Sequence, residues 1–221
     1  MNIPHRAPID QCAWPFLAGP AALLGVTLFG PWRLLSAAFV ALMSFLVFFF
    51  RDPERQPPAD PRAVVSPADG VVTGVHLNDQ PEAGPLGGPC ISIFLAVWNV
   101  HVNRVPQDGV VERVTYVPGG HALAWKHSAA GNESNWIHFR SKQYRFVVRQ
   151  IAGKVARRVV CRLRAGDSVR KGQRLGIIKL GSRTDLYLPP GSQVLVRAGD
   201  RVSGGSSIVA VMPEARNGSP S

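Results

Sequence analysis

The sequence predicts a mainly β domain preceded by an N-terminal hydrophobic helical membrane anchor. Two charge-free apolar segments occupy most of the chain before Arg51, and short Val/Ile-rich runs separated by Gly and Pro follow. Stretches with helical periodicity are scarce beyond residue 55; one short helix is expected over His121–Ala130. We therefore expect an anchor over residues 1–55 and a β-rich domain over residues 56–221.

The two apolar segments, Trp14–Gly30 and Leu34–Phe50, have 17 residues each. A helix of that length spans roughly 25 Å, less than the ~30 Å hydrocarbon core of a bilayer. A hairpin that crosses twice and an anchor that enters one leaflet both remain open. In either case the flanking arginines lie on the side of the β-rich domain, which the positive-inside rule predicts to be the cytoplasm. These arginines are Arg6, Arg51, Arg55 and Arg62.

A buried pair of core helices is the alternative to an anchor. The second apolar segment ends in Phe45-Leu46-Val47-Phe48-Phe49-Phe50 and lacks the polar stripe of a soluble surface helix. The membrane interpretation is therefore favoured.

The part of the chain after the anchor has the composition of a linker followed by strands. Residues 56–61 are Pro-rich and polar, as linkers are. Beyond them, runs rich in β-branched residues predict strands. The clearest runs are Val71-Val72, Ile91–Leu95, Arg145–Val148 and Ile208–Val211.

Two internal repeats accompany these strands. Pro67–Val75 is repeated as Pro106–Val114, and Gly166–Gly172 is repeated as Gly199–Gly205. Asp-Gly and Gly-Asp at fixed distances from valines predict turns that join short strands. The second repeat resembles the half-motifs of lipoyl- and biotinyl-type barrels, in which two similar halves form a flattened β-sandwich. We therefore expect a barrel-sandwich architecture for the β-rich domain.

Composition limits the function classes. The net charge is +11 and the pI about 10.6, which suits an anionic membrane surface, and no nucleic-acid recognition motif is present. Cys12, Cys90 and Cys161 are widely spaced and form no Cys-x-x-Cys pair. We therefore expect neither a disulfide framework nor a zinc site, and we expect the protein to lie in a reducing compartment.

The hexapeptide Leu180–Asp185 is the most informative stretch for chemistry, because it contains a serine directly after a glycine between two apolar runs. In a sharp turn, such a serine can attack the preceding carbonyl, which the glycine leaves unhindered, and convert the amide to an ester. Elimination then gives dehydroalanine, which hydrolyses to an N-terminal pyruvoyl group. Gly-Ser alone is weak evidence, since the pair recurs at Gly191-Ser192, Gly205-Ser206 and Gly218-Ser219.

The wider context of this serine carries a family resemblance. Five blocks extend along the chain: Arg51–Arg55, Ser66–Gly70, Asn99–Arg104, Gly166–Gly176 and Leu180–Pro189. In order and spacing they closely resemble the short-form phosphatidylserine decarboxylases. A looser match is Asn132–Asn135, which reads Asn-Glu-Ser-Asn where that family usually has Asn-Glu-Arg-Asn.

The resemblance implies a pyruvoyl-dependent decarboxylase that is made as a zymogen. Autocatalytic cleavage between Gly181 and Ser182 would give a β chain, residues 1–181, and an α chain, residues 182–221, which stay packed as a heterodimer; a higher oligomer remains open. The implied cofactor is pyruvate, bound covalently as a pyruvoyl group derived from Ser182. It forms a Schiff base with phosphatidylserine and accepts electrons as CO₂ leaves, which yields phosphatidylethanolamine. The implied partners are this lipid and the anionic membrane surface.

Two further residues carry expected roles. His101, in the block Asn99–Arg104, is expected to donate the proton that replaces CO₂, because histidine alone titrates near neutral pH without perturbation. Asp69 is expected to orient a base during self-cleavage, because the resemblance assigns an aspartate of the Ser66–Gly70 block to maturation. The alternative for Asp69 is a plain turn residue, since Asp108 occupies the same place in the repeat.

One position departs from long-form relatives, which carry a second histidine in a maturation relay. Arg104 stands there, so His101 serves both steps or another histidine, His121 or His127, substitutes. The block Asn132–Asn135 either lines a headgroup site through Asn132, Glu133 and Asn135 or shapes a loop.

Rival functions have less support. A non-enzymatic membrane adaptor or carrier with lipoyl-like halves would explain the anchor and the repeats, but it needs a modified lysine such as Lys179 at the tip, where Gly181-Ser182 stands. A metal-dependent hydrolase lacks paired histidines, so no metal is expected, and a serine hydrolase lacks the Gly-x-Ser-x-Gly elbow around Ser182.

Overall fold

The chain divides into two compact units, Met1–Glu54 and Arg55–Ser221. The computed structural model describes residues 8–28, 32–77, 86–119, 132–142, 144–153, 159–178 and 182–214. The helix expected over His121–Ala130 lies outside the described residues, as do Lys179 and Gly181.

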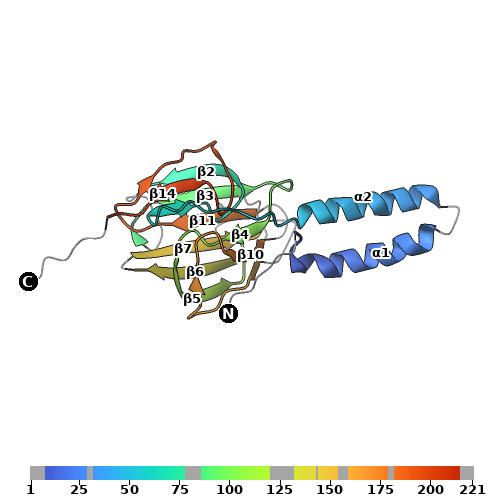
Figure 1. Cartoon of the computed structure of the whole chain (residues 1–221), viewed down its shortest axis with the longest axis horizontal. Helices are drawn as coiled ribbons and strands as arrows, with labels where there is room; N and C mark the ends of the chain where they lie inside the picture. Colours follow the sequence, from blue (N-terminus) through green and yellow to red (C-terminus); the bar gives the residue numbers. More distant parts are fainter. Residues whose placement is uncertain are drawn as a thin grey trace, which may run out of the picture. The chain divides into compact units, whose positions relative to one another are not determined.

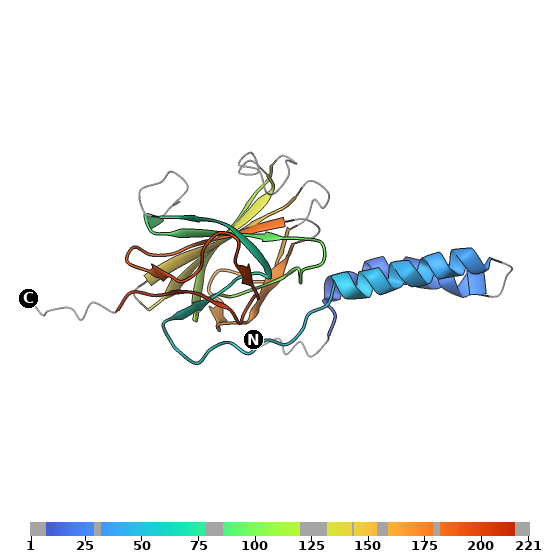
Figure 2. The same cartoon turned by 90° about the horizontal axis from the view of Figure 1, so that it is seen from above.

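The first unit is a helical hairpin. The 3₁₀ helix η1 (Gln11–Ala13) leads into α1 (Trp14–Leu28), which packs beside α2 (Arg33–Phe49) (Figures 1 and 2). The open end of the hairpin is fastened by backbone hydrogen bonds from Asp10 N to Phe50 O (2.8 Å) and from Asp52 N to Pro8 O (2.7 Å). The two predicted apolar segments are therefore confirmed as helices.

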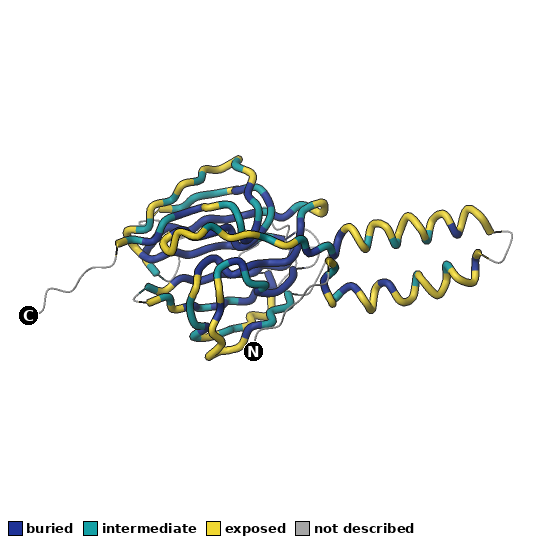
Figure 3. Tube along the Cα trace, in the orientation of Figure 1, coloured by how far each residue is buried: buried dark blue, intermediate teal, exposed yellow. Residues whose placement is uncertain are grey.

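Most residues of both helices are exposed (Figure 3), large apolar ones among them. Leu34 is 90% exposed and Trp14 68%, which is unfavourable in water and favourable in a hydrocarbon phase. Within the described residues, one helix, Gln11–Leu28, is long and apolar enough to cross a membrane, and Arg33–Phe49 is apolar but shorter. This hairpin is a candidate membrane anchor.

The second unit is made of strands, so the mainly β prediction is confirmed. Its largest sheet has eight described strands in the order β13-β2-β3-β11-β7-β6-β5-β9 and curls around the core, and two three-stranded sheets have the orders β1-β14-β12 and β4-β10-β8 (Figure 1). The strands are β1 (Ala63–Val65), β2 (Gly70–His76), β3 (Cys90–Leu95), β4 (Val102–Arg104), β5 (Gly109–Val117), β6 (Ser134–Ser141), β7 (Tyr144–Ile151), β8 (Val159–Cys161), β9 (Ser168–Val169), β10 (Arg174–Ile178), β11 (Ser182–Tyr187), β12 (Gln193–Val194), β13 (Arg201–Val202) and β14 (Ile208–Val211).

The two sequence repeats build the same structural unit twice. Val72 N donates to Asp200 O (2.9 Å) and Gly199 N to Val72 O (2.8 Å). At the equivalent positions of the other copy, Val111 N donates to Asp167 O (2.9 Å) and Gly166 N to Val111 O (2.8 Å). Each Asp-Gly segment is thus joined to a Gly-Asp segment distant in the sequence. Gly166 and Gly199 have φ of +90° and +97°, the left-handed region that these turns require.

Strand β11 lies inside the large sheet, between β3 and β7, and pairs antiparallel with both. Since side chains alternate along a strand, Ser182, Thr184 and Leu186 share one face, and Leu186 belongs to the main hydrophobic core. Arg183 and Asp185 lie on the opposite face. The residue predicted to be the nucleophile therefore faces the interior of the domain.

Candidate functional site

Ser182 begins β11 at one end of the large sheet, where it lies opposite Leu95 of β3. Its side chain is fully buried, and its Oγ has no hydrogen-bond partner among the described residues. Buried hydroxyls are normally paired, because an unpaired one costs free energy. A nucleophile must be able to turn toward the atom that it attacks, so a hydroxyl without a hydrogen-bond partner is the arrangement expected of one.

His101 lies immediately before β4 and is fully buried. Ile178, the last residue of β10, donates its N–H to the His101 carbonyl (3.2 Å). Four residue steps lead from Ile178 to Ser182, a reach of at most ~14 Å. The structure therefore brings His101 and the first residue of β11 into one region.

The His101 ring is held by its own loop. Its Nδ1 lies 2.9 Å from the Asn99 carbonyl oxygen. A carbonyl oxygen only accepts, so Nδ1 carries a proton and Nε2 is the atom that gains or loses one.

A row of buried polar side chains lies next to the candidate site, two residues further along the chain from His101 and Ser182. Gln150 Nε2 donates to Asn103 Oδ1 (2.7 Å), and Asn103 Nδ2 donates to Thr184 Oγ1 (3.4 Å); all three residues are fully buried. Asn103 lies two residues after His101, which precedes β4, and Thr184 lies two residues after Ser182 on the same face of β11. The row therefore ties β4 to β7 and β11 beside the candidate site. The sequence analysis did not predict that this row stabilises the domain. Polar residues at positions where a strand faces the interior were a signal that could have indicated it.

Asn103→Ala should lower the stability of the domain, since each partner left buried without a hydrogen bond costs about 1–3 kcal/mol. Adding Gln150→Ala to that variant should cost much less than it does alone, because its partner is already gone. Melting temperatures in detergent by near-UV circular dichroism measure both effects. Additive losses in the double variant would contradict the proposed row.

The block Asn132–Asn135 borders the same end of the sheet. Ser134 lies opposite Ile151, and Ile151 lies opposite Arg183. The Asn132 side chain donates to Ala152 O (2.9 Å), and Glu133 Oε1 accepts from Val159 N (3.2 Å). Both side chains hydrogen-bond to backbone groups of neighbouring segments, contacts that shape the chain at this place.

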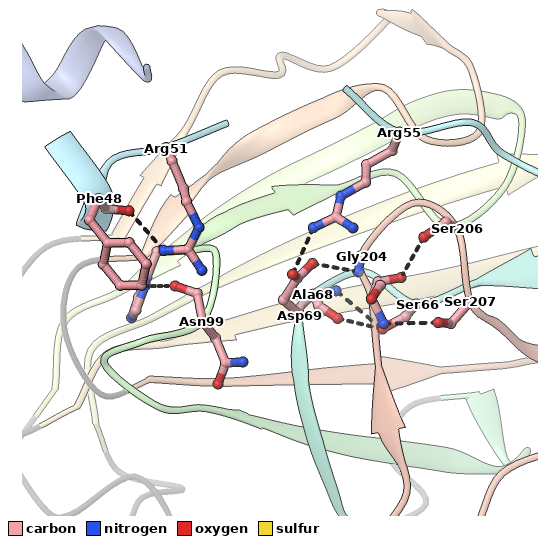
Figure 4. Close-up of polar contacts among 12 residues, drawn as sticks. Phe48, Arg51, Arg55, Ser66, Ala68, Asp69, Asn99, Gly204, Ser206 and Ser207 are labelled. Atoms are coloured by element: carbon pink, nitrogen blue, oxygen red, sulfur yellow. Dashed lines mark hydrogen bonds and ion pairs between the residues drawn. The ribbon is translucent and has the colours of Figure 1, made fainter. Parts of the chain in front are cut away.

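Asp69 precedes β2 at this same end, since Val71 lies opposite Phe94, and Phe94 lies opposite Arg183. Its Oδ2 accepts from Arg55 (2.7 Å) and its Oδ1 from Gly204 N (2.7 Å) (Figure 4). The equivalent Asp108 accepts from Lys171 N (2.7 Å).

Both aspartates therefore close a turn, as the alternative interpretation of Asp69 expected. They differ in two respects. Asp69 also forms the Arg55 ion pair, and Asp108 precedes Gly109 at the other end of the sheet, where β5 begins.

Arg104 takes the place of the second histidine. It is buried, and its Nη1 donates to Gly172 O (3.1 Å). This contact fastens β4 to one of the repeated turns. The substitutes considered for the relay, His121 and His127, lie outside the described residues.

The opposite face of β11 carries a buried ion pair that the sequence interpretation did not single out. Arg183 donates to both oxygens of Asp185 (2.6 and 3.0 Å) and to Ser92 Oγ (3.0 Å), and Asp185 is fully buried. Burial alone would lower the pKa of Arg183, but Asp185 outweighs it and the net shift is upward. Burial, together with Asp185, raises the pKa of Cys90 well above its ordinary value, so this thiol stays neutral.

In the described part of the chain, no group of three or more His, Cys, Asp or Glu side chains is placed so that it could hold a metal ion.

Comparison with known proteins gives a consistent result. A family model described as phosphatidylserine decarboxylase matches residues 42–210. A phosphatidylserine decarboxylase proenzyme of Burkholderia mallei is 43% identical over 220 residues, which cover 97% of this chain and 99% of that protein. Proteins of the same name from Pelobacter propionicus and Geotalea uraniireducens are 42% and 38% identical over 216 residues.

Proposed function

The chain belongs to the phosphatidylserine decarboxylase family, and on this premise we propose that it converts phosphatidylserine to phosphatidylethanolamine with a pyruvoyl group that it makes from Ser182. The observation that carries the proposal is the Ser182 hydroxyl, which is buried, lacks a hydrogen-bond partner among the described residues and directly follows Gly181. Such a hydroxyl fits a group made by backbone chemistry rather than one bound from solution.

The self-cleavage begins as the Ser182 Oγ attacks the Gly181 carbonyl carbon. A C–O bond forms, the peptide C–N bond breaks, and the former amide nitrogen becomes an amine. Loss of the Ser182 Hα and of the ester oxygen from Cβ then separates the chains and leaves dehydroalanine. Water replaces its nitrogen, which leaves as ammonia, and the ketone remains.

The two products are expected to stay together because of the strand order. The α chain contributes β11, and both neighbours of β11 in the sheet, β3 and β7, belong to the β chain. Strands β13 and β14 likewise pair with β2 and β1. Separation would break these four backbone ladders, which supports a heterodimer of α and β chains.

In the decarboxylation, the ketone supplies the electron sink through a Schiff base with the substrate amine. We assign His101 as the proton donor that replaces CO₂. The Asn99 carbonyl accepts from Nδ1–H, which leaves Nε2–H as the donating position of the protonated ring.

We assign Asp69 to the maturation step as the carboxylate that orients the base. Its position at the Ser182 end of the sheet supports this role, whereas the equivalent Asp108 lies at the other end. Arg55 and the Gly204 amide hold the carboxylate in a fixed orientation through the two hydrogen bonds.

The helical hairpin and the basic charge indicate where the reaction takes place. The exposed apolar helices support membrane anchoring, and the net charge of +11 favours a surface rich in anionic lipid. With Arg51 and Arg55 following the second helix, the positive-inside rule supports a catalytic unit on the cytoplasmic side.

Intact-mass spectrometry of the purified protein tests the proposal. We expect two fragments that meet at the Gly181–Ser182 bond, the C-terminal one bearing a ketone. Because hydrolysis exchanges an NH for an oxygen, the fragment masses should sum to slightly more than the uncut chain. Borohydride should add two hydrogens to the C-terminal fragment and abolish activity. An active protein that consists only of uncut chain would overturn the proposal.

A further inference from the structure

The loop between β3 and β4 presents apolar side chains to solvent beside the site. Val97 is 37% exposed and Trp98 70%. Asn99 N donates to Ala96 O (2.9 Å), and Asn99 Oδ1 accepts from Ala96 N (2.9 Å), so the turn is closed at its base and Val97 and Trp98 form its tip. A turn braced in this way holds its apolar tip outward.

This tip is coupled to the reacting residues on both sides. Leu95, just before the turn, lies opposite Ser182 in the sheet. Asn99, at the end of the turn, holds the His101 ring through its carbonyl. The tip therefore adjoins both residues to which the chemistry is assigned.

A second exposed apolar pair lies on the same end of the sheet. Tyr116 is 56% exposed and Val117 40%, and Val117 lies opposite Ser134, the first residue of β6. Ser134 in turn lies opposite Ile151, and Ile151 lies opposite Arg183, the residue after Ser182. Strands β5 and β3 are four strand spacings apart, roughly 19 Å along the sheet at ~4.8 Å each.

The other large apolar side chains exposed in this unit are Leu77, Leu195 and Ile208. Leu77 follows His76, which lies opposite Cys90 at the far end of β3. Four of the seven large apolar side chains exposed in the described β domain, Val97, Trp98, Tyr116 and Val117, therefore lie at the end of the sheet that contains Ser182.

We propose that Val97, Trp98, Tyr116 and Val117 form an apolar rim that rests in the surface of the bilayer, so that the edge containing Ser182 meets the lipid headgroups. This inference rests on the proposed function. Trp and Tyr are the side chains that favour the membrane–water interface, and the basic chain favours an anionic leaflet. A lipid substrate also keeps its acyl chains in the bilayer, so a site that acts on its headgroup must lie at that surface. The interfacial preference of Trp and Tyr and the positive charge of the chain favour a lipid surface over a protein partner.

Depth-dependent quenching tests the contact directly. The full chain, with Cys12 and Cys161 replaced by serine, carries an environment-sensitive label on Trp98→Cys or, as the matched control at the far end of the sheet, on Leu77→Cys. It is reconstituted into vesicles of phosphatidylcholine and phosphatidylglycerol with brominated acyl chains, which contain no substrate. The label at 98 should lose about half its fluorescence, because interfacial side chains bury to roughly 5–10 Å, and the label at 77 should not. Equal quenching at both positions, or none at 98, overturns the rim.

Kinetics give an independent readout. Trp98→Ala should slow decarboxylation of phosphatidylserine in vesicles about tenfold, the factor that 1.4 kcal/mol of lost contact corresponds to, and leave the rate on monomeric dihexanoyl phosphatidylserine unchanged. Leu77→Ala should alter neither rate, and complete self-cleavage of each variant reports its folding. An equal loss on both substrates contradicts the rim. Failure of the proposed function can be distinguished from failure of the rim. In that case the wild-type chain would act on neither substrate, while the label at 98 would still be quenched.

Discussion

Replacing Ser182 by alanine should leave one uncut chain of 23.9 kDa without measurable decarboxylation. Alanine has no oxygen to attack the Gly181 carbonyl, so neither the ester nor the ketone can form. The fold should persist, since the Ser182 hydroxyl makes no hydrogen bond to a described residue and Ala is smaller. Gel electrophoresis and intact mass measure the cleavage, release of labelled CO₂ measures the activity, and near-UV circular dichroism measures the fold.

The chain contains its own control for this variant. Ser192 also follows a glycine, Gly191, which has a φ of +81° in a turn, but its Oγ donates to Pro189 O (2.8 Å). Ser192→Ala should therefore be cut and active like the wild type. A Ser182→Ala chain that is still cut at this bond, or that still releases CO₂, would refute the maturation chemistry.

Replacing His101 by glutamine should reduce decarboxylation by roughly 10²–10⁴-fold, the usual contribution of a positioned general acid. Glutamine retains polarity and can donate to the Asn99 carbonyl, but it cannot supply a proton at the position of Nε2. Because His101 is also a candidate for the maturation step, the variant is expected to mature slowly. The rate of CO₂ release must therefore be divided by the cut fraction from intact mass.

His76 provides the matched control, since it lies at the far end of β2 opposite Cys90. His76→Gln should keep both cleavage and turnover near those of the wild type. If His101→Gln releases CO₂ at the wild-type rate per cut molecule, the proton comes from another group, and the assignment of His101 fails.

Local sequence patterns predicted the elements better than the contacts between them. The apolar segments predicted for residues 14–30 and 34–50 became α1 and α2 within two residues, because a charge-free run of that length has few alternatives to a helix. The Asp-Gly and Gly-Asp repeats predicted turns. They did not reveal that Asp69 and Asp108 each accept from a turn distant in the sequence, at Gly204 and Lys171.

The polar row shows why contacts were harder to predict. Asn103, Gln150 and Thr184 meet only once the register of three strands is known, and one shifted residue would turn each to the other face. The pair Arg183–Asp185 is a partial exception, since residues two apart on one strand share a face, and its spacing was visible in the hexapeptide. The family blocks singled out Ser182 and His101 as candidates, while their common place in the fold depends on the contact from Ile178 to His101.

The position of β11 between β3 and β7 has a consequence for what happens after the protein is denatured. In the proposed maturation, the uncut chain folds as one molecule, with the inner strand tethered to its neighbours at a high effective concentration. After the proposed cleavage, the same sheet could be rebuilt only by an encounter of two separate polypeptides, so recovery from denaturation should depend on protein concentration, and the lifetime of the cut protein should be set by its rate of unfolding. The proposal therefore predicts that each molecule assembles efficiently only as an uncut chain and that damaged copies are replaced by new synthesis.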